Sequence, residues 1–151
     1  MATYLKAIDV NAGFYVPPAG AIGVLSQVVT VGTADLVESG TLDIGYLPAN
    51  AKVVDVVMTA TDMDSASSPA IVIDLGDAGD PDRFINASTV GQTGTTIRAG
   101  NDLTTSATWS VHGGFAEPTL IYATIVTAPG TAVAGTLMVN VIYEVLEAGV
   151  A

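Results

Sequence analysis

The chain has 151 residues, of which 15 are acidic and 4 are basic, so its formal net charge is −11 at pH 7. This length predicts one domain with its own hydrophobic core, and the absence of cysteine excludes disulfides and thiolate metal sites. The negative charge repels phosphate groups, which excludes nucleic acids and anionic membranes as expected partners. Only 13% of the residues are charged, a low share for the surface of a small monomer. We therefore expect contacts with other subunits to bury part of the surface.

Residues 1–23 are predicted to form an extended N-terminal arm ahead of a single domain at 24–151. Pro17-Pro18 favours an extended path and prevents continuous strand pairing. The segment also keeps apolar side chains where a disordered linker would be polar. Two interpretations stay open, because the arm can fold back on its own domain or reach a neighbouring subunit. The candidate partner-binding residues are Tyr4, Phe14, Tyr15, Val16, Pro17 and Pro18.

Apolar residues at every second position predict strands in the first half of the chain. Candidate strands cover residues 24–31, 36–47, 52–60 and 71–75. In the third run, the residues predicted to share one apolar face are Val54, Val56, Met58 and Ala60. In the fourth, they are Ile71, Ile73 and Leu75. The stretch 52–85 is therefore interpreted as a β-hairpin, or two sequential strands, at the centre of the protein.

Residues 76–101 are punctuated by glycine and threonine and form the longest segment predicted to be irregular. Within it, residues 83–85 fit either a helical turn or a strand, and residues 96–99 fit a short strand. Loops of this length are usually functional or form interfaces.

The clearest predicted pair of strands is 119–127 with 136–146, joined by a loop at 128–135. In the second strand, the residues on one face are Leu137, Val139, Val141, Tyr143 and Val145. Residues 118–143 carry no charge, but Pro129 and Gly135 divide them into segments too short to cross a membrane as helices. About eight strands predict an all-β fold, an antiparallel β-sandwich, jelly roll or barrel.

An acidic cluster is the one candidate metal site. It comprises Asp74, Asp77, Asp80 and Asp82, with Asp62 and Asp64 in the preceding turn. Oxygen ligands on a glycine-containing loop suit Ca²⁺, although no glutamate closes the loop as in an EF-hand. The alternative is that these side chains bond nearby backbone N–H groups and stabilise turns. No cofactor is expected.

No catalytic motif is present, and the protein is predicted not to be an enzyme. His112 is the only histidine, and a nucleophile would have to come from a residue such as Ser106 or Ser110. Trp109 and Tyr122 could instead form a platform for sugars, although a single Trp is more often a core or interface anchor. A carbohydrate-binding or adhesin module of a phage or bacterial surface is therefore the alternative function.

Three stretches carry a resemblance to a known family. They are TLDIGYLPANAKVVDVVMTATDM, IVIDLGDAGDPDRFINAS and the terminal VNVIYEV. Over roughly residues 37–146 the chain resembles the small head-decoration, or cement, proteins of tailed bacteriophages. The resemblance implies a β-sandwich or jelly roll on the exterior of the virion that clamps neighbouring subunits of the major capsid protein. It implies no catalytic residues. The expected partners are the major capsid protein and further copies of this chain, as a homodimer or homotrimer.

Overall fold

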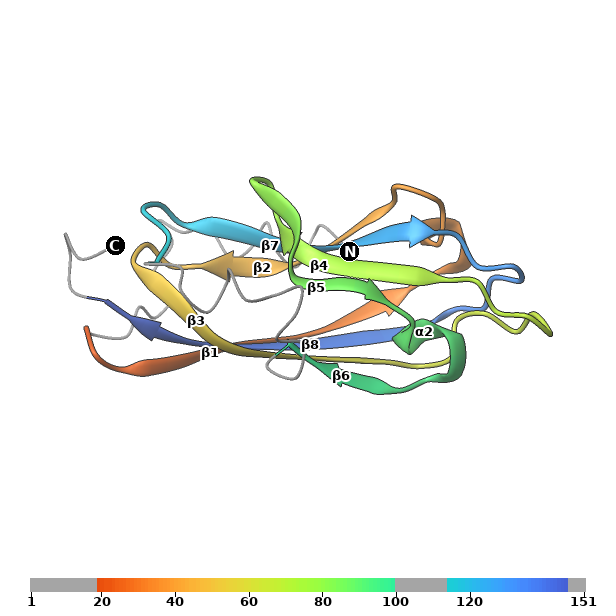
Figure 1. The fold of residues 1–151 in the computed structure, drawn as a ribbon, viewed down its shortest axis with the longest axis horizontal. Helices are drawn as coiled ribbons and strands as arrows, with labels where there is room; N and C mark the ends of the chain where they lie inside the picture. Colours follow the sequence, from red (N-terminus) through yellow and green to blue (C-terminus); the bar gives the residue numbers. More distant parts are fainter. Residues whose placement is uncertain (1–18, 100–113, 147–151) are drawn as a thin grey trace.

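The structure, a computed structural model, describes residues 19–99 and 114–146 and consists of two antiparallel four-stranded sheets packed face to face (Figure 1). Sheet A has the strand order β1-β8-β3-β6, and sheet B has the order β2-β7-β4-β5. The strands are β1 (Ile22–Val31), β2 (Thr41–Leu47), β3 (Ala51–Ala60), β4 (Val72–Asp77), β5 (Asp80–Ser88), β6 (Thr96–Arg98), β7 (Thr119–Thr127) and β8 (Gly135–Val145). Two single turns, η1 (Thr33–Asp35) and α2 (Val90–Thr93), are the helical elements of the described residues. The prediction of an all-β sandwich with about eight strands is confirmed.

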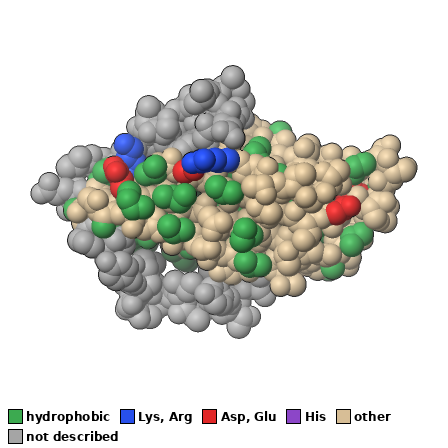
Figure 2. Space-filling view, turned by 90° about the horizontal axis from the view of Figure 1, so that it is seen from below, with side chains coloured by type: hydrophobic (Ala, Val, Ile, Leu, Met, Phe, Trp, Pro, Cys, Tyr) green, Lys and Arg blue, Asp and Glu red, His purple; other side chains and the backbone are tan. Residues whose placement is uncertain are grey.

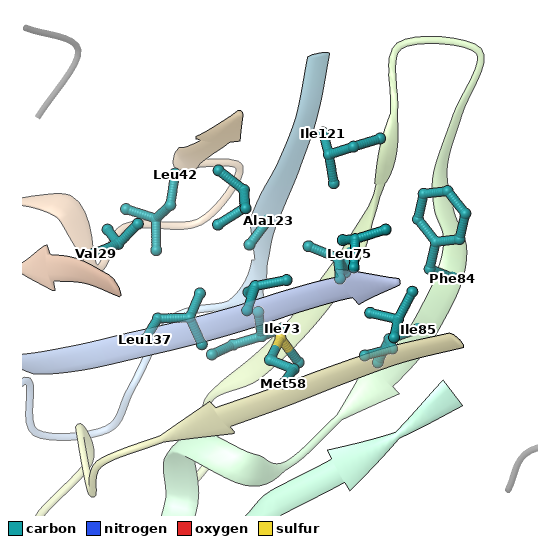
Figure 3. Close-up of a cluster of buried hydrophobic side chains, with 14 of the residues drawn as sticks. Val29, Leu42, Met58, Ile73, Leu75, Phe84, Ile85, Ile121, Ala123 and Leu137 are labelled. Carbon is teal, nitrogen blue, oxygen red and sulfur yellow. The ribbon is translucent and has the colours of Figure 1, made fainter. Parts of the chain in front are cut away.

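The core lies between the sheets and is made of inward-facing aliphatic side chains (Figure 3). Met58 and Leu137 come from sheet A, and Ile73, Leu75 and Ile121 come from sheet B; all five are fully buried. Burying each such side chain contributes roughly 1.5–3 kcal/mol to stability. The alternation predicted for 71–75 and for 136–146 is confirmed, because every residue assigned to the apolar face of these strands is buried.

The hairpin alternative for residues 52–85 is wrong, and so is the predicted pairing of 119–127 with 136–146. Strands β3 and β4 follow each other in sequence but lie in different sheets, and so do β7 and β8. Each of these strands has one apolar face. The opposite sheet of the sandwich can bury that face whether or not the next strand in sequence is a hydrogen-bonded partner. Period-2 patterning reports that a face is buried but not which sheet holds the strand. The stretch 52–85 is thus two sequential strands, β3 and β4, followed by β5.

The prediction of a long irregular segment at 76–101 is also wrong. This region contains β5, α2 and β6, and residues 83–85 belong to a strand. The pairing of β4 with β5 shifts register twice, which hides the period-2 signal. Gly76 is needed because a Cβ there would lie 2.2 Å from the carbonyl oxygen of Asp80. The glycine therefore marks a close approach of two strands rather than a loop.

A β-bulge corrects the predicted face of β3. The pairing with β8 shifts register between Val53 and Asp55. Val54, which was expected to face the core with Val56, is instead 47% exposed. An extra residue in one strand reverses the sides of all residues before it, and sequence alternation cannot show where this happens.

The boundary of the predicted arm also moves. β1 begins at Ile22, so the last two residues of the 1–23 segment belong to sheet A. The backbone N–H of Gly20 already donates to the carbonyl oxygen of Val145, at 2.7 Å. The described domain therefore begins before residue 20.

Candidate interaction surfaces

The outer face of sheet A is rich in exposed apolar side chains. β1 has apolar residues on both sides, because Val29 and Val31 face the core while Val24 and Val28 face outward. Five of the eight exposed large hydrophobic residues of the described chain belong to this sheet: Ile22, Val24, Val28, Val54 and Met138. Figure 2 views the molecule from this side and shows green hydrophobic groups gathered on it. We call these five residues the apolar patch.

Two pairs of polar side chains beside the apolar patch are bonded to each other. Ser26 Oγ donates to Asn140 Oδ1 at 2.6 Å, between β1 and β8. The hydroxyl groups of Thr59 and Thr96 lie 2.8 Å apart, between β3 and β6. A polar group that keeps its partner costs little free energy when a surface covers it. The face can therefore be covered without leaving these groups unsatisfied.

Charges on the strands of sheet A balance. The four strands carry two acidic and two basic residues. Arg98 forms an ion pair with the largely buried Asp55, which raises the pKa of the guanidinium. Lys52 lies directly across from Glu144 in the register of β3 and β8. Sheet A is thus neutral in a chain whose net charge is −11.

Charges on the strands of sheet B do not balance. These strands carry five acidic residues and one basic residue, Arg83. Asp43 and Asp74 alternate with core-facing residues and are half-exposed on the outer side. Partial burial raises the pKa of Asp74 above its ordinary value, opposed by the hydrogen bond from the backbone N–H of Ala87. This outer face is therefore acidic.

The turn between β4 and β5 holds most of the predicted metal ligands, each with a protein partner. Arg83 forms an ion pair with the buried Asp77, whose carboxylate also accepts the backbone N–H groups of Gly79 and Asp80. The guanidinium lies 5.9 Å from the ring centre of Phe115. A hydrogen bond to the Asp82 side chain raises the pKa of Asp80, and Asp82 also accepts from the Asn86 side chain.

These contacts match the turn-forming alternative for the acidic cluster. Asp74 bonds Ala87 on the outer face of sheet B, away from the ion pair at Asp77. Within the described residues, no three acidic or histidine side chains come together as a group that could hold a metal ion. The Ca²⁺ site stays a prediction for a titration to test.

Asp64 was grouped with the candidate metal ligands, but its carboxylate instead stabilises two connections between strands. Its carboxylate is buried and accepts backbone N–H groups of Ala66, Ala70, Ile71, Gly130 and Thr131. Burial alone would raise the pKa of Asp64, but these donors outweigh it and hold the pKa well below its ordinary value. The bonds tie the connection between β3 and β4 to the connection between β7 and β8. A short bridge between Asp64 and Ala132 joins the same two segments.

The remaining candidates divide into two groups. The arm residues Tyr4, Phe14, Tyr15, Val16, Pro17 and Pro18, together with Ser106, Trp109, Ser110 and His112, lie outside the described residues. Tyr122 lies half-buried on the outer face of sheet B, where its hydroxyl donates to the carbonyl oxygen of Asp77 at 3.1 Å. The apolar patch was not predicted, although the apolar residues on both sides of β1 were its signal.

Comparison with known proteins identifies the fold through solved structures. No protein-family model and no curated protein sequence matches the chain. A chain in "Capsid of Ralstonia phage GP4" is 22% identical with a TM-score of 0.75, and the match covers 92% of this chain and 94% of that chain. A chain in "Cyanophage Pam1 capsid asymmetric unit" is 22% identical with a TM-score of 0.67, covering 91% and 96%. The matched chains are therefore close to this one in length and share its fold. Among the described residues, no helix is long and apolar enough to cross a membrane.

Proposed function

We propose that the protein is a structural component of a tailed-phage particle that binds the outside of the capsid and stabilises contacts between major capsid subunits. The observation that carries this proposal is the likeness of the chain, over 92% and 91% of its length, to chains of two phage capsids. The proposal assigns no catalytic role to any residue.

The chemistry of the described residues supports a binding role. Carboxylates that a reaction or a metal ion would need are engaged in ion pairs or backbone hydrogen bonds, as at Asp64 and Asp77. The two sheets instead present broad outer faces, one neutral and apolar and one acidic. Broad faces of this kind suit contacts with other proteins.

The proposal includes the N-terminal arm as a contact with the shell or with a neighbouring subunit. About 18 extended residues span up to about 60 Å, which is enough to leave the domain and reach a neighbour. The described domain begins at Ala19, and the bond from Gly20 to Val145 fixes where a deletion must stop.

Co-sedimentation tests the proposed function. Purified capsid shells that lack this protein are mixed with the full chain and pelleted, and the bound fraction is measured over a range of salt concentrations. We expect saturable binding, and we expect the chain that lacks residues 1–18 to bind less while its circular dichroism spectrum stays that of a folded β protein. Absence of binding under every condition would refute the proposed function.

The deletion separates three roles for the arm. If the shortened chain unfolds, the arm belongs to the core of its own domain. If it folds and binds shells as well as the full chain does, the arm takes no part in attachment. Only loss of binding with retained folding supports the proposed contact.

A further inference from the structure

The apolar patch on sheet A is exposed on a face that no other described element covers. Val24, Val28 and Ile22 are 57–60% exposed, and Val54 and Met138 are 47% and 36% exposed. Scattered apolar residues are normal on a surface, but a group on one sheet face marks an interaction site. We propose that this face binds the same face of a second copy of the chain, so that two sandwiches associate through sheet A.

The register of the strands makes the patch continuous. Val24 lies across from Ile142, and Val28 lies across from Met138, in the pairing of β1 with β8. On the far side of β8, Asn140 lies across from Val57 of β3. Directly opposed side chains on one sheet face are about 5 Å apart, within contact distance. The apolar residues are therefore continuous across β1 and β8, and Val57 of β3 lies beyond the polar Asn140 on the same face.

The polar residues within this surface do not oppose association. Ser26 and Asn140 satisfy each other, as do Thr59 and Thr96, and Arg98 neutralises Asp55. Covering an unpaired polar group costs free energy, because the group loses its hydrogen bonds to water. That cost is avoided here because the partners lie within the same face.

The distribution of charge favours sheet A over sheet B as the face that binds a second copy. Two chains that each carry a net charge of −11 repel each other, and contact through sheet B would bring Asp43 and Asp74 of both copies together. Contact through sheet A brings neutral surfaces together. In such a dimer, the spacing between the two sheets of each chain separates the acidic outer face of sheet B from the interface. That spacing is about 10 Å, which exceeds the Debye length of about 8 Å at physiological ionic strength.

The size of the face predicts a weak and reversible dimer. Strands of about ten residues at about 3.3 Å per residue, spaced about 4.8 Å apart, give β1, β8 and β3 a combined area of roughly 500 Å². A stable interface buries roughly 800 Å² on each partner. The contact is isologous and closes with two copies, and we expect it to form in the micromolar range rather than the nanomolar range.

Analytical ultracentrifugation of the full chain tests this inference directly. We expect a shift from monomer to dimer between about 1 and 500 μM, the interval that brackets micromolar affinity. Added salt should strengthen the dimer, because it screens the repulsion between two acidic chains. The substitution Val28→Asp should weaken the dimer roughly tenfold or more, since it places a charge in a covered apolar contact.

Val126→Asp is the matched control. Val126 is 41% exposed on the outer side of β7 in sheet B, and its replacement adds the same charge to the same type of side chain. We expect this variant to dimerise nearly as the parent chain does. A parent chain that stays monomeric at every concentration, or equal loss of dimer in both variants, would overturn the inference.

A second measurement does not depend on a disruptive substitution. The chain has no cysteine, so Val28→Cys and Val126→Cys each introduce a single thiol of known location. Maleimide labelling of Val28→Cys should slow as protein concentration rises, while labelling of Val126→Cys should not. Concentration-independent labelling at both positions would overturn the inference. A monomer that still pellets with capsid shells would also overturn it and leave the proposed function intact.

Discussion

The two outer faces of the sandwich share one architecture and present different chemistry to the surroundings. Sheet A presents valine and isoleucine beside balanced charges, whereas sheet B presents half-exposed carboxylates at Asp43 and Asp74. Both faces use the same alternation along their strands. A strongly negative chain can therefore keep one side neutral, and that side is where protein contacts cost the least electrostatic energy.

The contrast also explains the low share of charged residues. Composition predicts that some surface is covered, but it does not tell which part. The strands of sheet A supply this surface of low charge, since β1 carries no charged residue along its ten positions. The chain therefore concentrates its acids on sheet B, on the β4–β5 turn and on the connections.

The greatest loss of stability is expected when a core-facing residue of β8 is truncated, and its outward-facing neighbour serves as the comparison. Leu137 is fully buried and its neighbour Met138 is 36% exposed on β8. Leu137→Ala should lower the free energy of unfolding by about 2–5 kcal/mol, because it leaves a cavity in the core. Met138→Ala should lower it by less than about 0.5 kcal/mol. Urea unfolding followed by circular dichroism measures both, and equal losses would contradict the assignment of Met138 to an outer face.

Next in size is the loss of the Asp64 carboxylate, which ties the β3–β4 connection to the β7–β8 connection. Asp64→Asn should lower the melting temperature by several degrees at neutral pH, because an amide cannot accept all five N–H groups. The folded pKa of Asp64 lies below its ordinary value, so its stabilisation is complete above about pH 3.9 and declines as pH falls below that value.

Melting curves between neutral and strongly acidic pH check the Asp64 prediction. The parent chain should lose stability at acid pH more steeply than Asp64→Asn, which has already lost the titrating group. Asp43→Asn on the outer face of sheet B serves as the control, and it should melt like the parent at neutral pH. An Asp64→Asn chain with unchanged stability would show that the hydrogen bonds at this residue are dispensable.

A smaller effect should follow from removing the charge balance of sheet A. Arg98→Gln leaves Asp55 without its cation and makes the face net negative. Dimerisation through this face should weaken about two- to fivefold, the range of an ion pair near a surface. Arg83→Gln removes the same charge from the β4–β5 turn and should leave dimerisation unchanged. Sedimentation of both variants at matched concentrations compares them, and weaker association of Arg83→Gln alone would place the contact elsewhere.

The smallest effect concerns Ca²⁺ on the acidic side. Ligand binding to the folded state alone raises the melting temperature by mass action. Because Arg83 and backbone N–H groups already engage Asp77, we expect millimolar Ca²⁺ followed by chelator to leave the melting temperature unchanged. A reversible rise would restore Asp74, Asp77, Asp80 and Asp82 as metal ligands.

The sequence predicted those parts of the fold that depend on local alternation. β4 as far as Leu75, and β8 from Leu137 onward, have regular period-2 patterns, and their buried faces were assigned correctly. In β3, the bulge near Val54 moved one residue to the opposite side. In β5, two register shifts and Gly76 concealed a strand within an apparently irregular segment. Bulges arise from pairing with a distant strand, and a local window does not contain that information.

The candidate site was less accessible to prediction than the fold. The acidic residues stood out because they cluster in sequence, yet Asp77 and Asp64 are engaged by Arg83 and by backbone groups brought from distant segments. The apolar patch depends on residues from three strands whose order in the sheet does not follow their order in the chain. Its residues are brought together because β8 lies between β1 and β3 in the sheet.

The central position of β8 also has a consequence for the timing of synthesis. In sheet A the first strand of the described residues pairs with the last, so that Ile22 lies across from Glu144. A ribosome makes about 5–20 residues per second, and β1 has no partner in its sheet until residue 145 has left the exit tunnel. Closing so long a loop makes folding slow. The surface proposed to hold a second copy is therefore complete only after β8 has joined β1 and β3.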